Sequence, residues 1–232
     1  MQISLKANVV ARTLGTVAAL LVLASIGGQF SKYVLGHGYL KGLVPLFFVD
    51  MEYNIPTFFS VLLLLLVALL LAVIAALNWK QRRPYTSKWA ILSFGFLFMA
   101  FDEAFQVHER LNLPISKLLG GDNLGIFYFA WVVPCIALLL VLGLFFLRFL
   151  LHLQIKTRLR FLMAATIYIG GAVGIELIGG RYAEIHDTQN LTYTMIATVE
   201  EGLEMAGLIF FIWALLKYFA DNYKELRLHF CA

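Results

Sequence analysis

The feature that most constrains this fold is a series of apolar runs, several longer than the roughly 18 residues that mark a candidate membrane-spanning helix. The Leu-rich run between Asn54 and Asn78 is the clearest of them. Inside a bilayer every backbone polar group must be satisfied within the protein, so spanning segments are helices or closed barrels. Overall, 61% of the residues are hydrophobic and 14% are charged. Soluble domains are nearer half apolar and a quarter charged.

We therefore predict an all-α polytopic membrane protein, folded as a single integral membrane domain with a bundle of six transmembrane helices. The second span is expected to begin with Asn54 as its N-cap and Pro56 in its first turn. The six expected spans cover approximately residues 9–34, 55–77, 89–107, 124–151, 162–178 and 191–219.

The arrangement of basic residues predicts the orientation. Most of the 18 Lys and Arg residues lie near the two termini and in the loops 78–88 and 152–160, which six spans place on one side. The positive-inside rule makes that side cytoplasmic. We expect a multi-pass protein of the inner or plasma membrane with cytoplasmic N- and C-termini. Because orientation accounts for the net charge of +4, we do not expect nucleic acid as a partner.

Carboxylates interrupt three of the apolar runs: Asp102 and Glu103 in the third, Glu176 in the fifth, Glu200 and Glu204 in the sixth. Ionisable groups at membrane depth are costly, and they are usually paired and functional. At a rise of about 1.5 Å per residue, Glu103 and Glu176 lie roughly 21 Å from the inner ends of their spans, and Glu200 roughly 14 Å below its outer end. These depths predict one site, assembled from three helices in the outer half of the membrane.

Helical geometry adds two expectations. On an ideal helix Asp102 and His108 point in nearly opposite directions. Either the helix breaks before His108, or the two residues serve different neighbours. In the fifth span, Gly170, Gly171 and Gly174 lie roughly opposite Glu176. This favours a helix packed closely on its glycine side, with Glu176 turned toward a different neighbour or a cavity.

So many carboxylates in a low-dielectric layer must bind a cation, share protons, or pair with scarce bases. A divalent metal (Fe, Zn or Mn) suits mixed carboxylate and imidazole donors. The Glu-x-x-His pattern of di-iron bundles is absent, because Phe105 stands three residues before His108. We predict Glu103 and Glu200 as catalytic residues. The predicted metal ligands are Asp102, His108, Glu176, Glu200 and Glu204.

Three functions remain open at this point. The first is a metal-dependent membrane enzyme acting on a lipid or other apolar substrate, with the metal activating water or oxygen. The second is a proton- or cation-coupled transporter or channel. The third is a non-catalytic subunit that binds partners in a larger membrane complex. The sequence holds no Walker A, Gly-x-Ser-x-Gly or His-Glu-x-x-His motif to decide between them.

Overall fold

The structure, a computed structural model, describes residues 6–121 and 123–223, and every regular element in these two ranges is a helix. The long helices are α1 (Ala7–Tyr33), α3 (Ile55–Lys80), α4 (Thr86–Phe105), α7 (Val132–His152), α8 (Ile155–Ile169) and α10 (Leu191–Asn222). The shorter ones are η1 (Leu40–Gly42), α2 (Leu43–Phe47), α5 (Val107–Arg110), α6 (Asn112–Leu118), η2 (Gly125–Phe127), η3 (Gly170–Ile175) and α9 (Glu176–His186).

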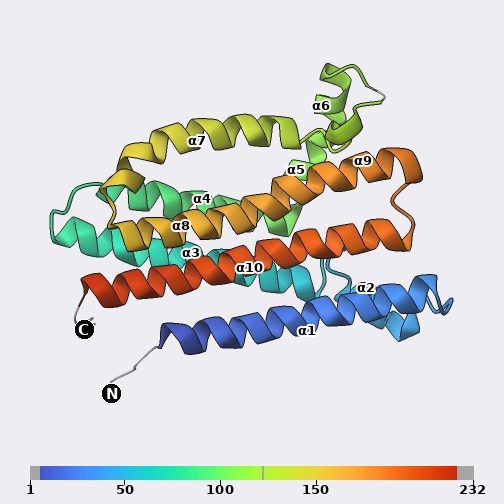
Figure 1. Ribbon diagram of the computed structural model, residues 1–232, viewed down its shortest axis with the longest axis horizontal. Coiled ribbons are helices and arrows are strands. Elements are labelled where there is room, and N and C mark those ends of the chain that lie inside the picture. Colours follow the sequence, from blue (N-terminus) through green and yellow to red (C-terminus); the bar gives the residue numbers. More distant parts are fainter. Residues whose placement is uncertain (1–5, 122, 224–232) are drawn as a thin grey trace.

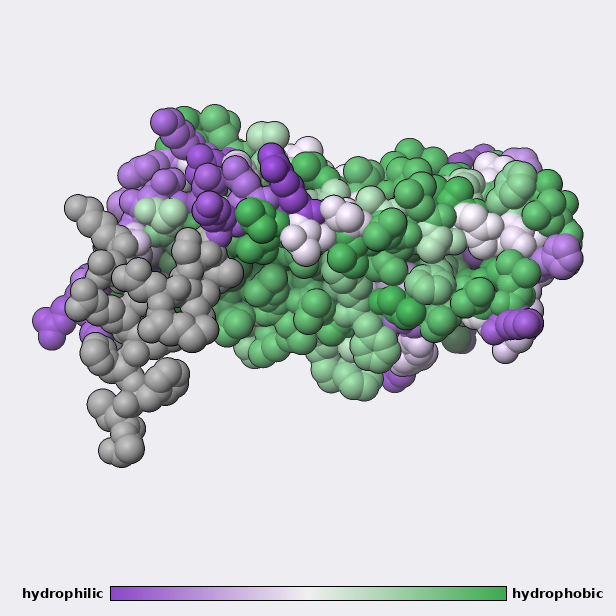
Figure 2. Space-filling model, turned by 90° about the horizontal axis from the view of Figure 1, so that it is seen from below, coloured by the Kyte–Doolittle hydropathy of each residue, from purple (hydrophilic) through white to green (hydrophobic). Residues whose placement is uncertain are grey.

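The long helices have the length and composition of membrane spans. Five of them are apolar enough to cross a membrane, and a sixth crossing follows if α4 and the bent segment after it form one span. The prediction of an all-α bundle with membrane-crossing helices is therefore confirmed. Apolar side chains cover the middle of the molecule in the view of Figure 2, and polar ones gather toward its two ends.

The long helices lie side by side, so the bundle has two distinct ends (Figure 1). We call one the basic end: α1 begins there, α10 finishes there, and the loops 81–85 and 153–154 turn there. The other, the connector end, carries α2, α5, α6 and the loop 187–190. The described parts of α1 and α10 thus begin and finish at the same end, as an even number of crossings requires.

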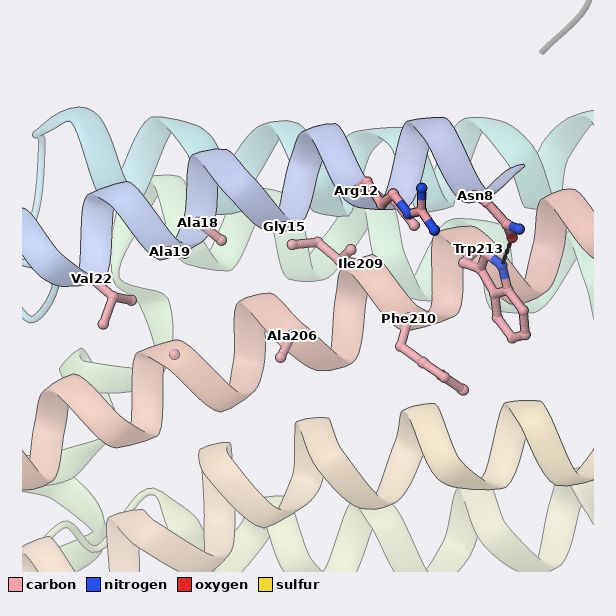
Figure 3. Close-up of a pocket in the computed structure, with 12 residues that line it drawn as sticks. Asn8, Arg12, Gly15, Ala18, Ala19, Val22, Ala206, Ile209, Phe210 and Trp213 are labelled. Atoms are coloured by element: carbon pink, nitrogen blue, oxygen red, sulfur yellow. Dashed lines mark hydrogen bonds between the residues drawn. The ribbon is translucent and has the colours of Figure 1, made fainter. Parts of the chain in front are cut away.

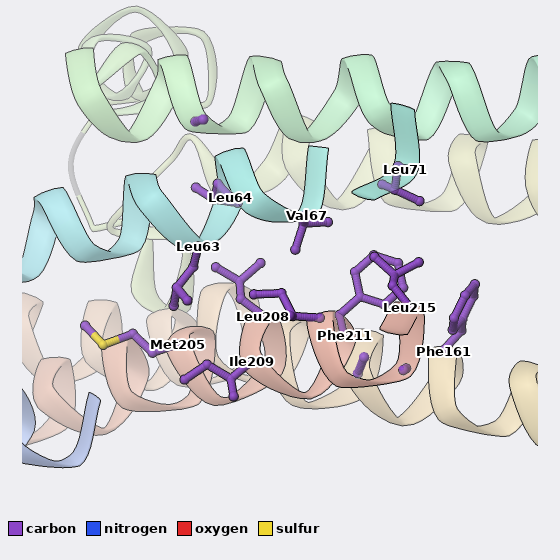
Figure 4. Packing of buried hydrophobic residues seen from close by; sticks show 14 of the residues in the cluster. Leu63, Leu64, Val67, Leu71, Phe161, Met205, Leu208, Ile209, Phe211 and Leu215 are labelled. Atoms are coloured by element: carbon purple, nitrogen blue, oxygen red, sulfur yellow. The ribbon is translucent and has the colours of Figure 1, made fainter. Parts of the chain in front are cut away.

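Helix α10 lies centrally and packs against α8, α1 and α3. On α3 the residues Leu63, Val67 and Leu71 follow one another at four-residue spacing, so they form a single stripe. That stripe faces α10, where Leu215 belongs to the same buried cluster (Figure 4). These four side chains and Ile212 of α10 have no exposed surface. The middle of the bundle is therefore a closed apolar core between its two ends.

Helix α1 packs along α10 less completely. A groove of about 610 Å³ runs between the two helices, lined mainly by small and apolar side chains (Figure 3). At the other edge of the bundle, α7 leaves Leu140, Val141 and Leu144 exposed. Such surfaces are ordinary for helices that face lipid tails.

Several helix boundaries differ from those expected. The fourth span begins at Val132 rather than near residue 124, because residues 125–131 form a 3₁₀ turn and a loop that starts at Gly125 with a φ of +64°. The fifth helix runs without a break over Ile155–His186, longer than the expected 162–178. Its polar ends continue the helix beyond the apolar part that hydropathy detects. The expected N-cap is confirmed, since Asn54 Oδ1 accepts a hydrogen bond from the Thr57 amide at 3.1 Å.

Candidate functional site

The chain bends sharply just after the carboxylates of α4. Helix α4 ends at Phe105, and Gln106 adopts the left-handed region with a φ of +55°. The segment that follows leaves at 69° to α4. A left-handed residue at the end of a helix is a common stop, although Gly is usual there and Gln is not. The bend carries His108 out of the line of α4 and back toward Asp102.

Asp102 holds the segment after the bend through both of its carboxylate oxygens. Oδ1 accepts the backbone amide of His108 at 2.8 Å, and Oδ2 lies 2.8 Å from the imidazole Nδ1 of the same residue. Of the two alternatives left open by the sequence, the first is therefore confirmed: the helix breaks and the two residues are partners. In a neutral imidazole whose Nδ1 carries the proton, Nε2 has a free lone pair. His108 is thereby arranged as a proton acceptor or a ligand.

Trp131, the residue before α7, joins His108 to the fifth helix. The Trp131 and His108 rings lie 4.7 Å apart between centroids. The Trp131 indole Nε1 donates a hydrogen bond to Glu176 Oε1 at 2.9 Å. Sequence reasoning assigned Trp131 to the apolar interior of a span. The signal that could have found it is the indole N–H, which needs a partner wherever the ring is buried.

The turn before Glu176 is a π-helix, Gly170–Ile175. A Cβ atom on Gly171 would lie 2.8 Å from the Glu200 carbonyl oxygen and 3.3 Å from Glu204 Cγ, so α10 approaches this turn closely. Gly170 and Gly174 have no heavy atom within 4 Å of the same position. The expected close packing is therefore limited to Gly171.

Glu176 meets Trp131 through the indole hydrogen bond, and its carboxyl also lies near enough to that of Glu200 on α10 for the two to interact. The expectation that Glu176 turns toward a different neighbour from Gly171 is confirmed by the Trp131 contact, and the wider π turn also changes the angular positions of the residues, so that Glu176 lies near α10 as well. One turn deeper on α10, Glu204 lies near Tyr168 of α8. All of these carboxylates are half-buried. The site thus contains a carboxyl–carboxyl pair with a third carboxyl beneath it.

A polar recess of about 210 Å³ opens at the connector end. Asp50 is exposed to the recess, yet the surrounding protein and then the carboxylates of Glu176, Glu109 and Glu52 raise its pKa to about 7. Desolvation likewise raises the pKa of Glu52, against a hydrogen bond from Gln106 that lowers it. The recess is lined by Lys32, Tyr33, Phe48, Asp50, Glu109, Thr188, Gln189, Tyr193 and Thr194.

The predicted site residues are thus distributed over neighbouring contacts. Glu176 and Glu200 lie near each other, Glu204 is one turn further along α10, and Asp102 pairs with His108. Glu103 lies close enough to His108 and Asp102 for its carboxyl to interact with their charges. Over residues 6–121 and 123–223, no three His, Cys, Asp or Glu side chains form a group that could hold a metal ion. The catalytic and metal-binding roles of all six residues stay predictions. Asp50 and Trp131 were not predicted.

Comparison with known proteins identifies the family. No curated protein and no solved structure matches the chain. The family profile described as "Domain of unknown function (DUF8692)" matches residues 13–219. The matched range includes the bend after α4, the π-helix before Glu176 and the carboxylates of α10. The chain belongs to the DUF8692 family.

Proposed function

We propose that the connector end forms a cation site in which a bound cation competes with protons. The observation that carries this proposal is the close approach of α10 at Glu200 to the turn before Glu176, which brings the two carboxyls near enough to interact. Two ionised carboxylates that lie near each other in a half-buried setting repel each other. A shared proton relieves the repulsion, and so does a cation. The pair is therefore suited to exchange one for the other.

The surroundings of the pair support access from one end. The recess brings solvent to Asp50, whose charge is felt at Glu176. Further toward the basic end, α3 and α10 pack through a closed apolar core that includes Leu63, Val67 and Ile212. Such a geometry favours a binding site with a single entrance over a continuous pore. Coupling to transport would then require a second conformation that opens the other side.

His108 supplies a second proton acceptor beside the pair. Asp102 fixes its Nδ1, so a proton would be gained or lost at Nε2. Its ring lies against that of Trp131 in a tilted arrangement, and Trp131 donates a hydrogen bond to Glu176. Protonation of His108 therefore places a positive charge near Glu176, and it would weaken the binding of another cation there.

The distribution of basic residues indicates which side of the membrane the site would face. The basic residues of the two short loops favour a cytoplasmic basic end by the positive-inside rule. The recess would then face outward from an inner or plasma membrane. Cysteines placed one at a time in the loops 187–190 and 81–85 of the chain in whole cells would test this, because an impermeant thiol reagent should label only the former.

A competition experiment tests the proposed function. Purified chain is titrated with Na⁺, Ca²⁺, Mn²⁺ or Zn²⁺ in two buffers of different ionisation enthalpy, and the heat difference measures the protons released. At least one cation should release protons, and Glu200→Gln should abolish the release. The control is Asp221→Asn, which removes an exposed carboxylate that pairs with Arg160. Absence of proton release with every cation would overturn the proposal.

The Asp102–His108 contact favours a metal-dependent enzyme as a second candidate. Metal-binding histidines usually donate their other ring nitrogen to a carboxylate, as His108 does to Asp102. Since no three His, Cys, Asp or Glu side chains of the described residues are grouped to hold a metal ion, Fe, Zn or Mn at His108 Nε2 would require a conformation that brings oxygen ligands from Glu103, Glu176, Glu200 or Glu204 to it, and Asp102 would orient His108. The metal would supply activation of water or oxygen for attack on a lipid or apolar substrate. Elemental analysis of the gently purified chain and of the variants His108→Ala and Glu200→Ala tests this. The unaltered chain should contain a stoichiometric amount of metal, and both variants should have lost it. Metal-free chain would exclude a resident metal.

A further inference from the structure

The groove between α1 and α10 is a second candidate binding surface, separate from the carboxylates. Its walls are small residues on both helices, among them Gly15 and Ala19 of α1 and Gly202 and Ala206 of α10. Figure 3 shows these helices running past each other with the groove between them. Its volume of about 610 Å³ falls within the roughly 300–1,000 Å³ typical of small-molecule sites.

Polar groups are confined to the basic end of this groove. Arg12 and Asn8 come from the first turns of α1, and Trp213 comes from α10 (Figure 3). The Trp213 indole Nε1 donates to Asn8 Oδ1 at 2.8 Å, which fixes the indole at this level. The Arg160 guanidinium lies 5.2 Å from the Trp213 ring centroid. Arg12 is exposed and forms no ion pair within the described part of the chain.

We propose that this groove binds one acyl chain of an anionic phospholipid, with the lipid phosphate held by the Arg12 guanidinium. The charge is complementary: the Arg12 guanidinium, which has no ion-pair partner among the described residues, is at the mouth, and its planar donor fork suits phosphate. The length of the groove also fits an acyl chain. From Arg12 to Val22 the groove follows ten residues of α1, which is about 15 Å, or half of a hydrocarbon core about 30 Å thick.

The same length argues against a partner helix as the occupant. A helix that crosses the bilayer needs about 20 residues, and it would extend well beyond a groove that ends near Val22. A lipid of the leaflet at the basic end fills this length from the head-group level inward. Basic residues near a membrane surface attract anionic lipids, so the basic end supplies the electrostatic attraction. The inference is independent of the proposed cation site.

The experiment places the full chain in nanodiscs of phosphatidylcholine, with or without phosphatidylglycerol, and counts the lipids retained after gentle release by native mass spectrometry. One phosphatidylglycerol per chain should be retained in preference to phosphatidylcholine. Arg12→Gln should lower that preference about fivefold, the effect of one surface cation, and Arg12→Lys should restore part of it. Lys156→Gln, which removes an exposed cation of the same end, should leave it unchanged.

A second pair of variants tests the groove itself. Ala206→Phe fills the groove, whereas Val141→Phe adds the same ring to an exposed position of α7. Only Ala206→Phe should reduce lipid retention. Equal retention of both lipids, or equal effects of Arg12→Gln and Lys156→Gln, would overturn the proposal. So would a dimer of this chain that Ala206→Phe dissociates, because the groove would then hold a second copy.

Discussion

Asp102 binds His108 twice across the bend at Gln106, through the backbone amide and through the imidazole Nδ1, each at 2.8 Å. The left-handed conformation of Gln106 is unfavourable by about 1–2 kcal/mol for a residue with a Cβ. Hydrogen bonds to a charged group contribute about 1.5–3 kcal/mol each. The carboxylate therefore offsets the strain of the bend and fixes the ring that it positions.

Replacement of Asp102 by Asn should change the tautomer of His108. The amide oxygen of Asn can still accept the His108 backbone N–H, but its NH₂ group would face Nδ1. The neutral imidazole would then carry its proton on Nε2. Nitrogen-15 NMR of histidine-labelled protein should show this exchange, and the free energy of unfolding should fall by about 1–3 kcal/mol. Glu109→Gln, an exposed change beside His108, serves as the control. An unchanged tautomer in Asp102→Asn would contradict the assignment.

Asp50 should make stability depend on pH. Its pKa is about 7 in the folded chain, against an ordinary value of 3.8. Between these values the folded state binds the proton more tightly than the unfolded state, so stability is greatest at the acid end and declines as pH rises toward 7. Asp50→Asn removes this decline. Thermal unfolding midpoints between pH 4.5 and 8 should therefore show a smaller decrease for Asp50→Asn than for the unaltered chain.

Asp187→Asn is the matched change at the same end of the bundle, and its amide keeps the oxygen that accepts from the Thr188 amide. Its pH profile should follow the unaltered chain. If both variants flatten the profile equally, Asp50 is not the titrating group.

The spans could be predicted from the sequence because hydropathy reports burial in lipid directly. Asn54 could be predicted as a cap because its side chain precedes Pro56 and an apolar run. The sequence predicted the break before His108 only as one of two alternatives, and it did not point to Gln106. A helix leaves Asp102 and His108 on opposite faces, but nothing in the local residue types marks Gln106 as left-handed, a conformation that Gly or Asn usually adopts.

The arrangement around Glu176 could not be predicted from helical periodicity. A π turn inserts a residue into the repeat, so every face assigned beyond Gly170 with an ideal α-helix rotates. Helical periodicity also carries no information about contacts between segments that are distant in the sequence. Trp131 and Glu176 are 45 residues apart, and Asp50 reaches the site from a connector. Depth along the spans predicted only that Glu176 and Glu200 lie in one layer.

Trp131→Phe should weaken the connector end through one hydrogen bond. Phe keeps an aromatic ring beside His108 but leaves the Glu176 carboxyl without its indole donor. The free energy of unfolding should fall by about 0.5–1.5 kcal/mol, and the carbonyl stretch of any protonated Glu176–Glu200 pair should shift in infrared difference spectra. Trp79→Phe, at a position 78% exposed at the basic end, controls for loss of an indole. Equal effects of the two variants would argue against a specific role for the Trp131 N–H.

Gly171→Ala should separate the fifth and sixth membrane helices at the carboxyl pair. The added Cβ would lie 2.8 Å from the backbone oxygen of Glu200 and 3.0 Å from Leu203 Cβ, and backbone cannot swing aside as a flexible side chain can. Overpacking of this kind costs about 1–3 kcal/mol. Gly174→Ala is the matched control, because its added Cβ meets no atom within 4 Å. It should be neutral or stabilising by up to about 1 kcal/mol. Unfolding in detergent measures both variants.

The cation titration then shows whether the distance between Glu176 and Glu200 matters: Gly171→Ala should weaken proton release and Gly174→Ala should not. Equal stability and equal proton release in the two variants would mean that the close approach at Gly171 has no part in the site.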